Sequence, residues 1–128
     1  MALPAPQQQP HDAGLLDAYS AKVADAVDRI GPAVCRIERI AEGRAAGHGS
    51  GFVIAPDGLI VTNFHVVGDA RAVRVGLPDS TSTEGRVLGR DPDTDIALVR
   101  ADGHFTDIAP IGDSGRLRRG QIALASGN

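Results

Sequence analysis

A histidine and an aspartate thirty positions apart are the residues of this sequence best suited to proton-transfer chemistry. His65 follows one apolar run, and Asp95 precedes another. Histidine is an effective base because its pKa lies near neutral pH. A carboxylate on one ring nitrogen fixes the tautomer and stabilises the imidazolium that forms when the other nitrogen takes a proton from a nucleophile. We therefore predict that His65 and Asp95 lie side by side, with an Asp95 oxygen near Nδ1 of His65.

Taken alone, His65 and Asp95 can each be explained as an ordinary structural residue. Only the surrounding motifs favour a catalytic role for them. A histidine after an apolar strand is usually a partly buried polar residue, and an aspartate there can simply end a turn. Residues 49–67, however, read GSGFVIAPDGLIVTNFHVV, and residues 91–99 read DPDTDIALV. In this order and at this spacing the two segments resemble the HtrA/Deg type of trypsin-like serine protease. The resemblance covers nearly everything after Leu15.

The resemblance implies a fold, an activity and partners. The fold is the first barrel of the trypsin-like double-barrel domain, with His65 as catalytic base and Asp95 as its carboxylate. The activity is peptide-bond hydrolysis in protein quality control, with unfolded or misfolded polypeptides as substrates of the complete form. Members of the family also form homo-oligomers through residues near the amino terminus. A peptide-binding PDZ domain often follows the protease domain.

The sequence offers no convincing nucleophile for this pair. Ser114 lies in Gly-Asp-Ser-Gly, but Gly115-Arg116 follows it, and it stands only 19 residues beyond Asp95. We interpret it as a turn residue, and Ser50 as part of a structural strand. The chain is therefore predicted to be a fragment or truncated form of an HtrA-like endopeptidase, inactive alone. Two alternatives remain open: an inactive binding module or pseudo-protease, and a half-enzyme completed by a second chain.

Composition excludes several other functions. The chain has 128 residues, enough for one domain, and 13 basic against 16 acidic residues give a net charge of −3, which argues against a nucleic-acid partner. The single cysteine, Cys35, cannot form an internal disulfide. We expect no metal site, because Cys35, His48 and His104 lack the short spacing of zinc ligands and His11 lies in the leader. We expect no cofactor.

The sequence leaves the compartment unknown. No apolar stretch is long enough for a membrane span, and we expect no membrane partner. The first residues carry no signal peptide. As written, the protein is expected in the cytoplasm; if a leader has been removed, it belongs in the periplasm or cell envelope.

A leader and a helix are predicted before the barrel. The Pro- and Gln-rich start predicts a disordered leader over residues 1–14. Asp12 is a plausible helix cap, and an apolar stripe then predicts an amphipathic helix over Leu16–Ile30. We expect this helix to pack on the outside of the barrel. We expect residues 15–128 to hold the helix and the first barrel, without the second barrel.

From Ala33 onward the pattern predicts an all-β fold, a small antiparallel six-stranded barrel ending near Ala125. Apolar residues alternate at period two, and Pro56-Asp57-Gly58 marks a hairpin. Ala41–Gly49, rich in glycine and alanine, is predicted to be a mobile loop. Without a second barrel, the flank near His65, Asp95 and the strand ending at Asn128 should be an exposed apolar patch. The candidate strands are 34–40, 51–55, 59–63, 72–77, 85–89, 95–100 and 121–125.

Overall fold

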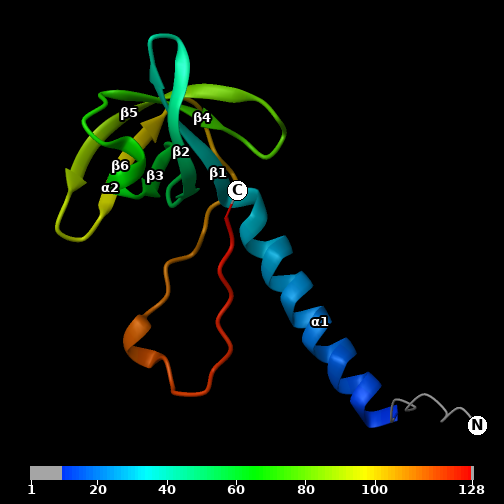
Figure 1. The fold of residues 1–128 in the computed structure, drawn as a ribbon. Helices are drawn as coiled ribbons and strands as arrows, with labels where there is room; N and C mark the ends of the chain where they lie inside the picture. The colour runs from blue at the N-terminus through cyan, green and yellow to red at the C-terminus, as the bar shows by residue number, and fades with distance from the viewer. Residues whose placement is uncertain (1–9, 128) are drawn as a thin grey trace, which may run out of the picture.

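The computed structural model describes residues 10–127 and contains a closed antiparallel barrel, in the order β1-β2-β3-β6-β5-β4 (Figure 1). The predicted fold class, a small six-stranded antiparallel barrel with one amino-terminal helix, is confirmed. The helices are α1 (Pro10–Ile30) and α2 (Phe64–Val67), with short 3-10 turns at Gly31–Ala33 (η1) and Ser114–Arg116 (η2). The strands are β1 (Val34–Ala41), β2 (Arg44–Val53), β3 (Leu59–Thr62), β4 (Ala72–Gly76), β5 (Ser82–Asp91) and β6 (Ile96–Ala101).

The barrel interior is filled by small and β-branched side chains. Along each strand every second residue points inward, as the period of two requires. Val and Ile suit these positions because their branched side chains pack well on a pleated sheet, and each fully buried one contributes about 1.5–3 kcal/mol. One cluster contains the buried core residues Cys35, Ile37, Val53, Ile60, Val66, Val67, Val73, Val75, Ala97, Val99 and Ala101.

The prediction of a mobile loop over Ala41–Gly49 is wrong. β1 and β2 form one long hairpin, and Arg44 to Gly49 belong to β2. Glu42 and Gly43, at the tip, both have positive φ, 54° and 76°, as a two-residue turn matching the strand twist requires. Glycine and alanine favour strands weakly, but pairing with β1 overrides this weak preference. Of these residues, Gly49 packs so closely on Val66 that a Cβ would clash.

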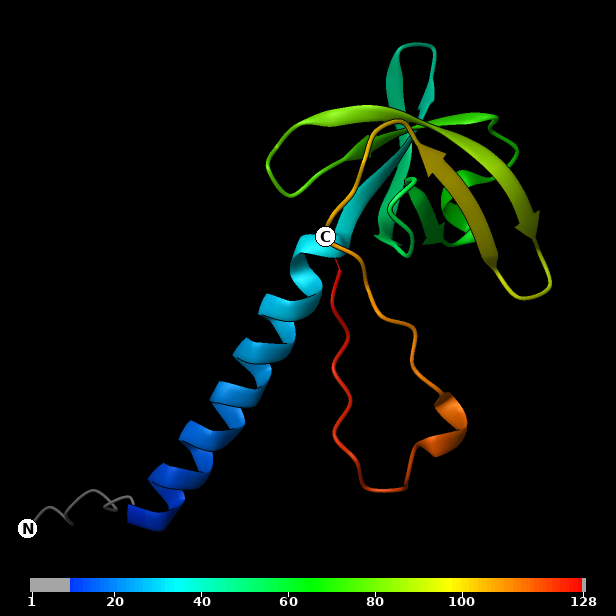
Figure 2. The same cartoon turned by 180° about the vertical axis from the view of Figure 1, so that it is seen from behind.

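Helix α1 differs from the prediction in its start and in its packing. It begins at Pro10, since proline is tolerated in a first helical turn, so residues 10–14 of the predicted leader are helical; residues 1–9 lie outside the described part of the chain. The helix does not pack on the barrel: it projects away from it in both views (Figures 1 and 2). Leu15, Leu16 and Tyr19 remain 66%, 56% and 50% exposed.

The strand predicted over residues 121–125 does not form. In the structure this segment is extended but belongs to no sheet, and it runs back beside α1 after a long excursion (Figure 2). Toward the end of the helix the two line a common groove, formed by Val23, Ala26, Val27, Ile30, Leu124, Ala125 and Ser126. Across residues 10–127, no helix combines the length and apolarity that crossing a membrane requires.

Candidate active site

Two strand ends bring His65 and Asp95 together. β3 pairs with β6 in antiparallel register, with Thr62 opposite Ala97. The end of β3 therefore lies beside the start of β6. His65 stands in the single-turn helix α2 just after β3, and Asp95 is the residue immediately before β6. The sequence predicted the two strand ends but not the short helix that carries the histidine.

The predicted contact between the two side chains is present. Nδ1 of His65 lies 2.6 Å from Oδ2 of Asp95, and the backbone N–H of His65 donates to Oδ1 of the same carboxylate at 2.9 Å. The backbone contact has the length of a charge-assisted N–H···O hydrogen bond, and the contact with the ring is slightly shorter. The His65 side chain is 69% exposed and that of Asp95 46% exposed. The carboxylate thus occupies one side of the imidazole, and much of the ring faces solvent.

Asp95 has an unusual backbone that its neighbours hold in place. Its φ is +58°, in the left-handed region that an L-residue other than glycine adopts at a cost and that aspartate tolerates better than most. Its carbonyl oxygen accepts from the Phe64 N–H at 3.1 Å and from the side-chain amide of Asn63 at 3.0 Å. Hydrogen bonds thus hold Asp95 both at its backbone carbonyl and at its carboxylate. The role of Asn63 was not predicted, although it stands two residues before His65 in the motif.

The turn before Asp95 is built by side chains of the same motif. Asp91 accepts from the Asp93 backbone N–H at 3.1 Å and from the Thr94 hydroxyl at 2.9 Å. Such local bonds are the ordinary way in which aspartate and threonine stabilise tight turns. The DPDTD sequence therefore closes the hairpin between β5 and β6 and places Asp95 opposite α2.

Hydrogen bonding favours the charged carboxylate. The backbone N–H of His65 and, next to it, the His65 ring lower the pKa of Asp95 below its ordinary value. Because donors that contact an ionised oxygen stabilise the charged form, Asp95 is ionised at neutral pH. An ionised carboxylate against Nδ1 stabilises a positively charged imidazole.

Gly49, on β2, is a second residue whose role was not predicted. A Cβ at this position would lie 2.4 Å from Cγ2 of Val66. Val66 is buried and belongs to α2 beside His65. The glycine thus allows the helix that carries the histidine to lie directly on β2.

The two serines considered in the sequence are placed differently. Ser114 begins η2, in the excursion after the barrel, away from α2 in both views (Figures 1 and 2). There Asp113 accepts from the Gly115 N–H at 2.9 Å, which agrees with a turn. Ser50 lies on β2, and its carbonyl accepts from the Thr62 hydroxyl at 2.8 Å.

A groove of about 440 Å³ lies against the outer side of the strands that carry the pair. Asn63 links the groove to the site, because this residue lines the groove and its side-chain amide donates to the carbonyl of Asp95. Ile96, at the start of β6, is 46% exposed there. The groove is lined by Ile30, Val34, Ser50, Gly51, Phe52, Val61, Thr62, Asn63, Ile96 and Ser126; Asn128, part of the predicted apolar flank, lies outside the described residues.

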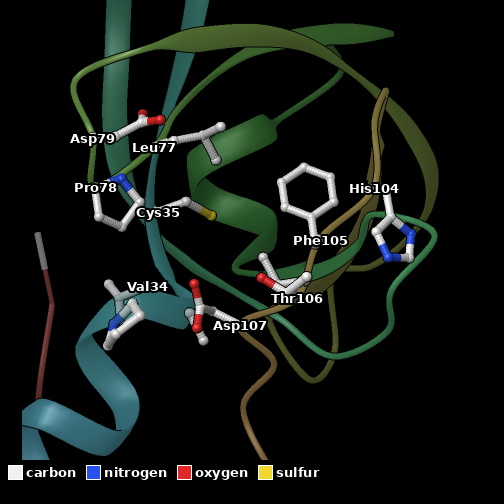
Figure 3. A pocket seen from close by; sticks show the side chains of 12 residues that line it. Val34, Cys35, Leu77, Pro78, Asp79, His104, Phe105, Thr106 and Asp107 are labelled. Atoms are coloured by element: carbon white, nitrogen blue, oxygen red, sulfur yellow. The ribbon is translucent and has the colours of Figure 1, made fainter.

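A smaller cavity of about 220 Å³ lies apart from the pair. The Cys35 thiol and the Phe105 ring point into it, and His104 stands at its rim (Figure 3). Burial raises the pKa of Cys35 to about 11, so the thiol stays protonated at neutral pH and is a poor nucleophile. His48 lies on β2 opposite Glu38. Within residues 10–127, no three His, Cys, Asp or Glu side chains gather as metal ligands would.

The family model for the trypsin-like peptidase domain matches residues 49–128, more than half of the chain. This chain belongs to the trypsin-like peptidase family. The matched region contains both motifs and therefore both members of the His65–Asp95 pair.

Relatives of this trypsin-like peptidase domain include HtrA-type serine proteases. It is 42% identical over 113 residues to mitochondrial serine protease HTRA2 from Bos taurus, and 38% identical over 112 residues to serine protease HTRA1B from Danio rerio. Each match covers 83% of this chain but only 25% and 24% of the relative. The serine endoprotease of Yersinia pestis is similar in structure, with a TM-score of 0.65 and 30% identity over 70% of this chain and 32% of that one. The chain thus spans about a third or less of the proteins it matches.

Proposed function

We propose that this chain supplies the histidine and aspartate of a serine endopeptidase whose nucleophile lies on a second barrel. The observation that carries the proposal is the 2.6 Å contact between Nδ1 of His65 and the Asp95 carboxylate. With Nδ1 bound to Asp95, Nε2 is the nitrogen that takes the proton of an attacking serine hydroxyl and later donates it to the leaving amine. Asp95 holds the tautomer and stabilises the imidazolium.

The proposed activity also requires a nucleophile and oxyanion donors in addition to His65 and Asp95. A peptide carbonyl attacked by serine becomes an oxyanion, which needs N–H donors placed where that charge develops. In a two-barrel protease the nucleophile and these donors come from the second barrel, across the cleft from His65. Ser114 is not the nucleophile in this proposal.

The proposed substrates of the complete enzyme are unfolded or misfolded polypeptides, as the resemblance to HtrA-type enzymes implies.

Two features support a second barrel as the partner of this one. The groove beside Asn63 and Ile96 leaves apolar side chains open on the flank that carries the pair. The extended segment 121–127 alternates exposed Ile122 and Leu124, 73% and 48% exposed, with small residues. Such alternation suits a strand whose sheet partners come from elsewhere.

Activity labelling of the purified chain tests the assignment of the nucleophile. A fluorophosphonate probe reacts only with an activated serine. We expect no labelled serine and no casein turnover, because the proposal places the nucleophile on a second barrel. Labelling at Ser114, with casein turnover that His65→Ala abolishes, would overturn the proposal. Sizing at several concentrations shows whether the open flank causes self-association, as large exposed apolar patches do.

The coding sequence downstream of Asn128 separates a single-chain protease from the alternatives. An in-frame continuation into a Gly-Asn-Ser-Gly-Gly motif supports the proposal. A stop codon favours an inactive binding module, or a half-enzyme that a second chain completes. Adding the second barrel as a separate polypeptide then distinguishes these two, because only the half-enzyme gains casein turnover.

A further inference from the structure

The helix that carries His65 is held at both ends by Arg90 and Asp95, which lie on either side of the turn between β5 and β6. At its start, Asp95 accepts from the backbone N–H groups of Phe64, at 3.1 Å, and His65, at 2.9 Å. At its end, the guanidinium of Arg90 donates from Nη1 to the carbonyl of Gly68 and from Nη2 to that of Ala70, the latter at 3.0 Å. Arg90 lies near the end of β5 and Asp95 just before β6, so both sit on the same hairpin.

Helix α2 needs such support because its own hydrogen bonds cannot stabilise it. It has four residues, and a single isolated turn is not stable in water. Carbonyls at the end of a helix lack partners within it, and two in the loop that leaves α2 point at Arg90. The chain exits through Gly68 with φ +54° and ψ −129°, a conformation open essentially to glycine alone.

The residues around Gly68 leave no room for a side chain where the chain leaves α2. A Cβ on Gly68 would lie 2.4 Å from Nη1 of Arg39, so a second arginine packs directly over the glycine. Arg90 itself is partly buried. A planar guanidinium can bridge two carbonyls in one fixed geometry, whereas a lysine ammonium offers a single point of contact.

From this arrangement we infer that Arg90 is a positioning residue for His65. By holding the two carbonyls that follow α2, it fixes the orientation of the helix, and with it the angle at which the imidazole meets Asp95. The hydrogen bonds of Arg90 go to the backbone that follows α2, so its effect on His65 passes through that backbone. The inference rests on the proposed function, since it gives Arg90 a part in aligning the His65–Asp95 pair.

The tautomer of His65 provides a direct measurement of this alignment. In neutral imidazole the proton is on Nδ1 when a carboxylate faces that nitrogen, and ring ¹⁵N chemical shifts report its position. The variants are Arg90→Gln and, as matched control, Arg86→Gln, which alters an exposed arginine on the same strand. Spectra of the purified full chain are recorded at alkaline pH. Circular dichroism confirms that each variant is folded.

We expect Arg90→Gln to shift a substantial fraction of the proton from Nδ1 to Nε2 and Arg86→Gln to leave the ratio unchanged. A folded Arg90→Gln variant with the parental ratio, or an equal shift in Arg86→Gln, would overturn the inference. If Arg90→Gln does not fold, Arg90→Lys replaces it. Its single ammonium should give a smaller shift in the same direction, and an unshifted ratio would again overturn the inference.

Asp95→Asn separates failure of this inference from failure of the proposed function. It removes the carboxylate itself, so the Nδ1–H tautomer should lose its preference whatever Arg90 does. A parental ratio in Asp95→Asn would show that the pair does not set the tautomer, which contradicts the proposed catalytic pair. A normal response to Asp95→Asn together with none to Arg90→Gln contradicts only the role of Arg90.

Discussion

Two regions of the molecule differ in how they are held. The first, which we call the shoulder, comprises β3, α2 and the β5–β6 hairpin; it carries His65 and Asp95. The second, the stalk, comprises α1 and the returning segment 113–127. In the shoulder, hydrogen bonds connect residues about 30 positions apart. In the stalk, the helix follows a regular apolar pattern, yet Leu16, Tyr19 and Ile122 are half or more exposed.

The difference shows that regular local structure and tertiary support are separate properties. The shoulder contains a helix of one turn and a left-handed aspartate, both unfavourable alone, and long-range contacts maintain them. The stalk contains a helix of 21 residues whose large apolar side chains Leu15, Leu16, Tyr19 and Val27 are half or more exposed. Regions with few buried contacts open at a small free-energy cost, whereas core elements open only with global unfolding. The predictions below test this contrast.

The largest effect is expected from the same substitution made in the core and in the stalk. Ile60, on β3, is 0% exposed, and Ile122 is 73% exposed. Ile60→Ala removes buried methyl groups and leaves a cavity, which should lower the free energy of unfolding by about 2–5 kcal/mol. Ile122→Ala should change it by less than about 0.5 kcal/mol. Urea denaturation followed by circular dichroism measures both. Equal losses would contradict the contrast.

A smaller loss in the free energy of unfolding is expected from a substitution where β2 packs against α2. In Gly49→Ala the new methyl group must displace Val66, whose branched side chain has few alternative rotamers. Overpacking of this kind should cost about 1–3 kcal/mol. Gly112→Ala is the matched control, because a Cβ there has no neighbour within 4 Å.

The clash itself can be tested with a double variant. Trimming Val66 to alanine in the Gly49→Ala background should recover part of the loss, which a double-mutant cycle would report as a favourable coupling. Strictly additive losses would mean that the methyl group does not act through Val66.

The barrel was predictable from the sequence because its signals are local. Alternating apolar residues and the Pro56-Asp57-Gly58 turn located β1, β3, β4 and β6 to within one residue at each end, and the middle of β5. The β1–β2 hairpin was partly missed, since Gly47 and Gly49 suggest a loop until their pairing with β1 is known. The stripe of α1 correctly predicted a helix. Whether that stripe is covered depends on distant residues, which periodicity does not report.

The candidate pair was predictable, but its supports were not. His65 and Asp95 stand in motifs of recognisable order, so their contact followed from spacing and resemblance. Asn63 and Arg90 act through backbone carbonyls of other segments, and no side-chain pattern in the sequence indicates such partners. Gly49 matters because of one van der Waals contact, visible only in three dimensions.

A pH titration should show a smaller effect in the shoulder, through the lowered pKa of Asp95. Contacts with His65 lower the pKa of Asp95 in the folded chain. The unfolded chain therefore binds a proton more readily, so the stabilisation is present above the unfolded value of about 3.9 and disappears as pH falls through the lower folded value. The amide shift of His65, followed by NMR, should titrate with a midpoint below that of unfolded aspartate. Asp95→Asn should abolish this transition; a persisting transition would assign it to another group.

The smallest effect on the barrel is expected from the exposed face of the stalk. Leu16→Ala and Tyr19→Ala together remove large apolar groups from α1 but no core contact, and alanine preserves helix propensity. The barrel's free energy of unfolding, read from methyl resonances of its buried valines, should change by less than about 0.5 kcal/mol. A loss well above that value at low protein concentration would show that α1 packs on the barrel in solution. A parental midpoint that rises with protein concentration, and a variant midpoint that does not, would instead show that copies of the chain cover this face for one another, because association stabilises the folded state by mass action. With neither result, the helix is a solvent-exposed arm, and the barrel folds on the contacts of its own strands.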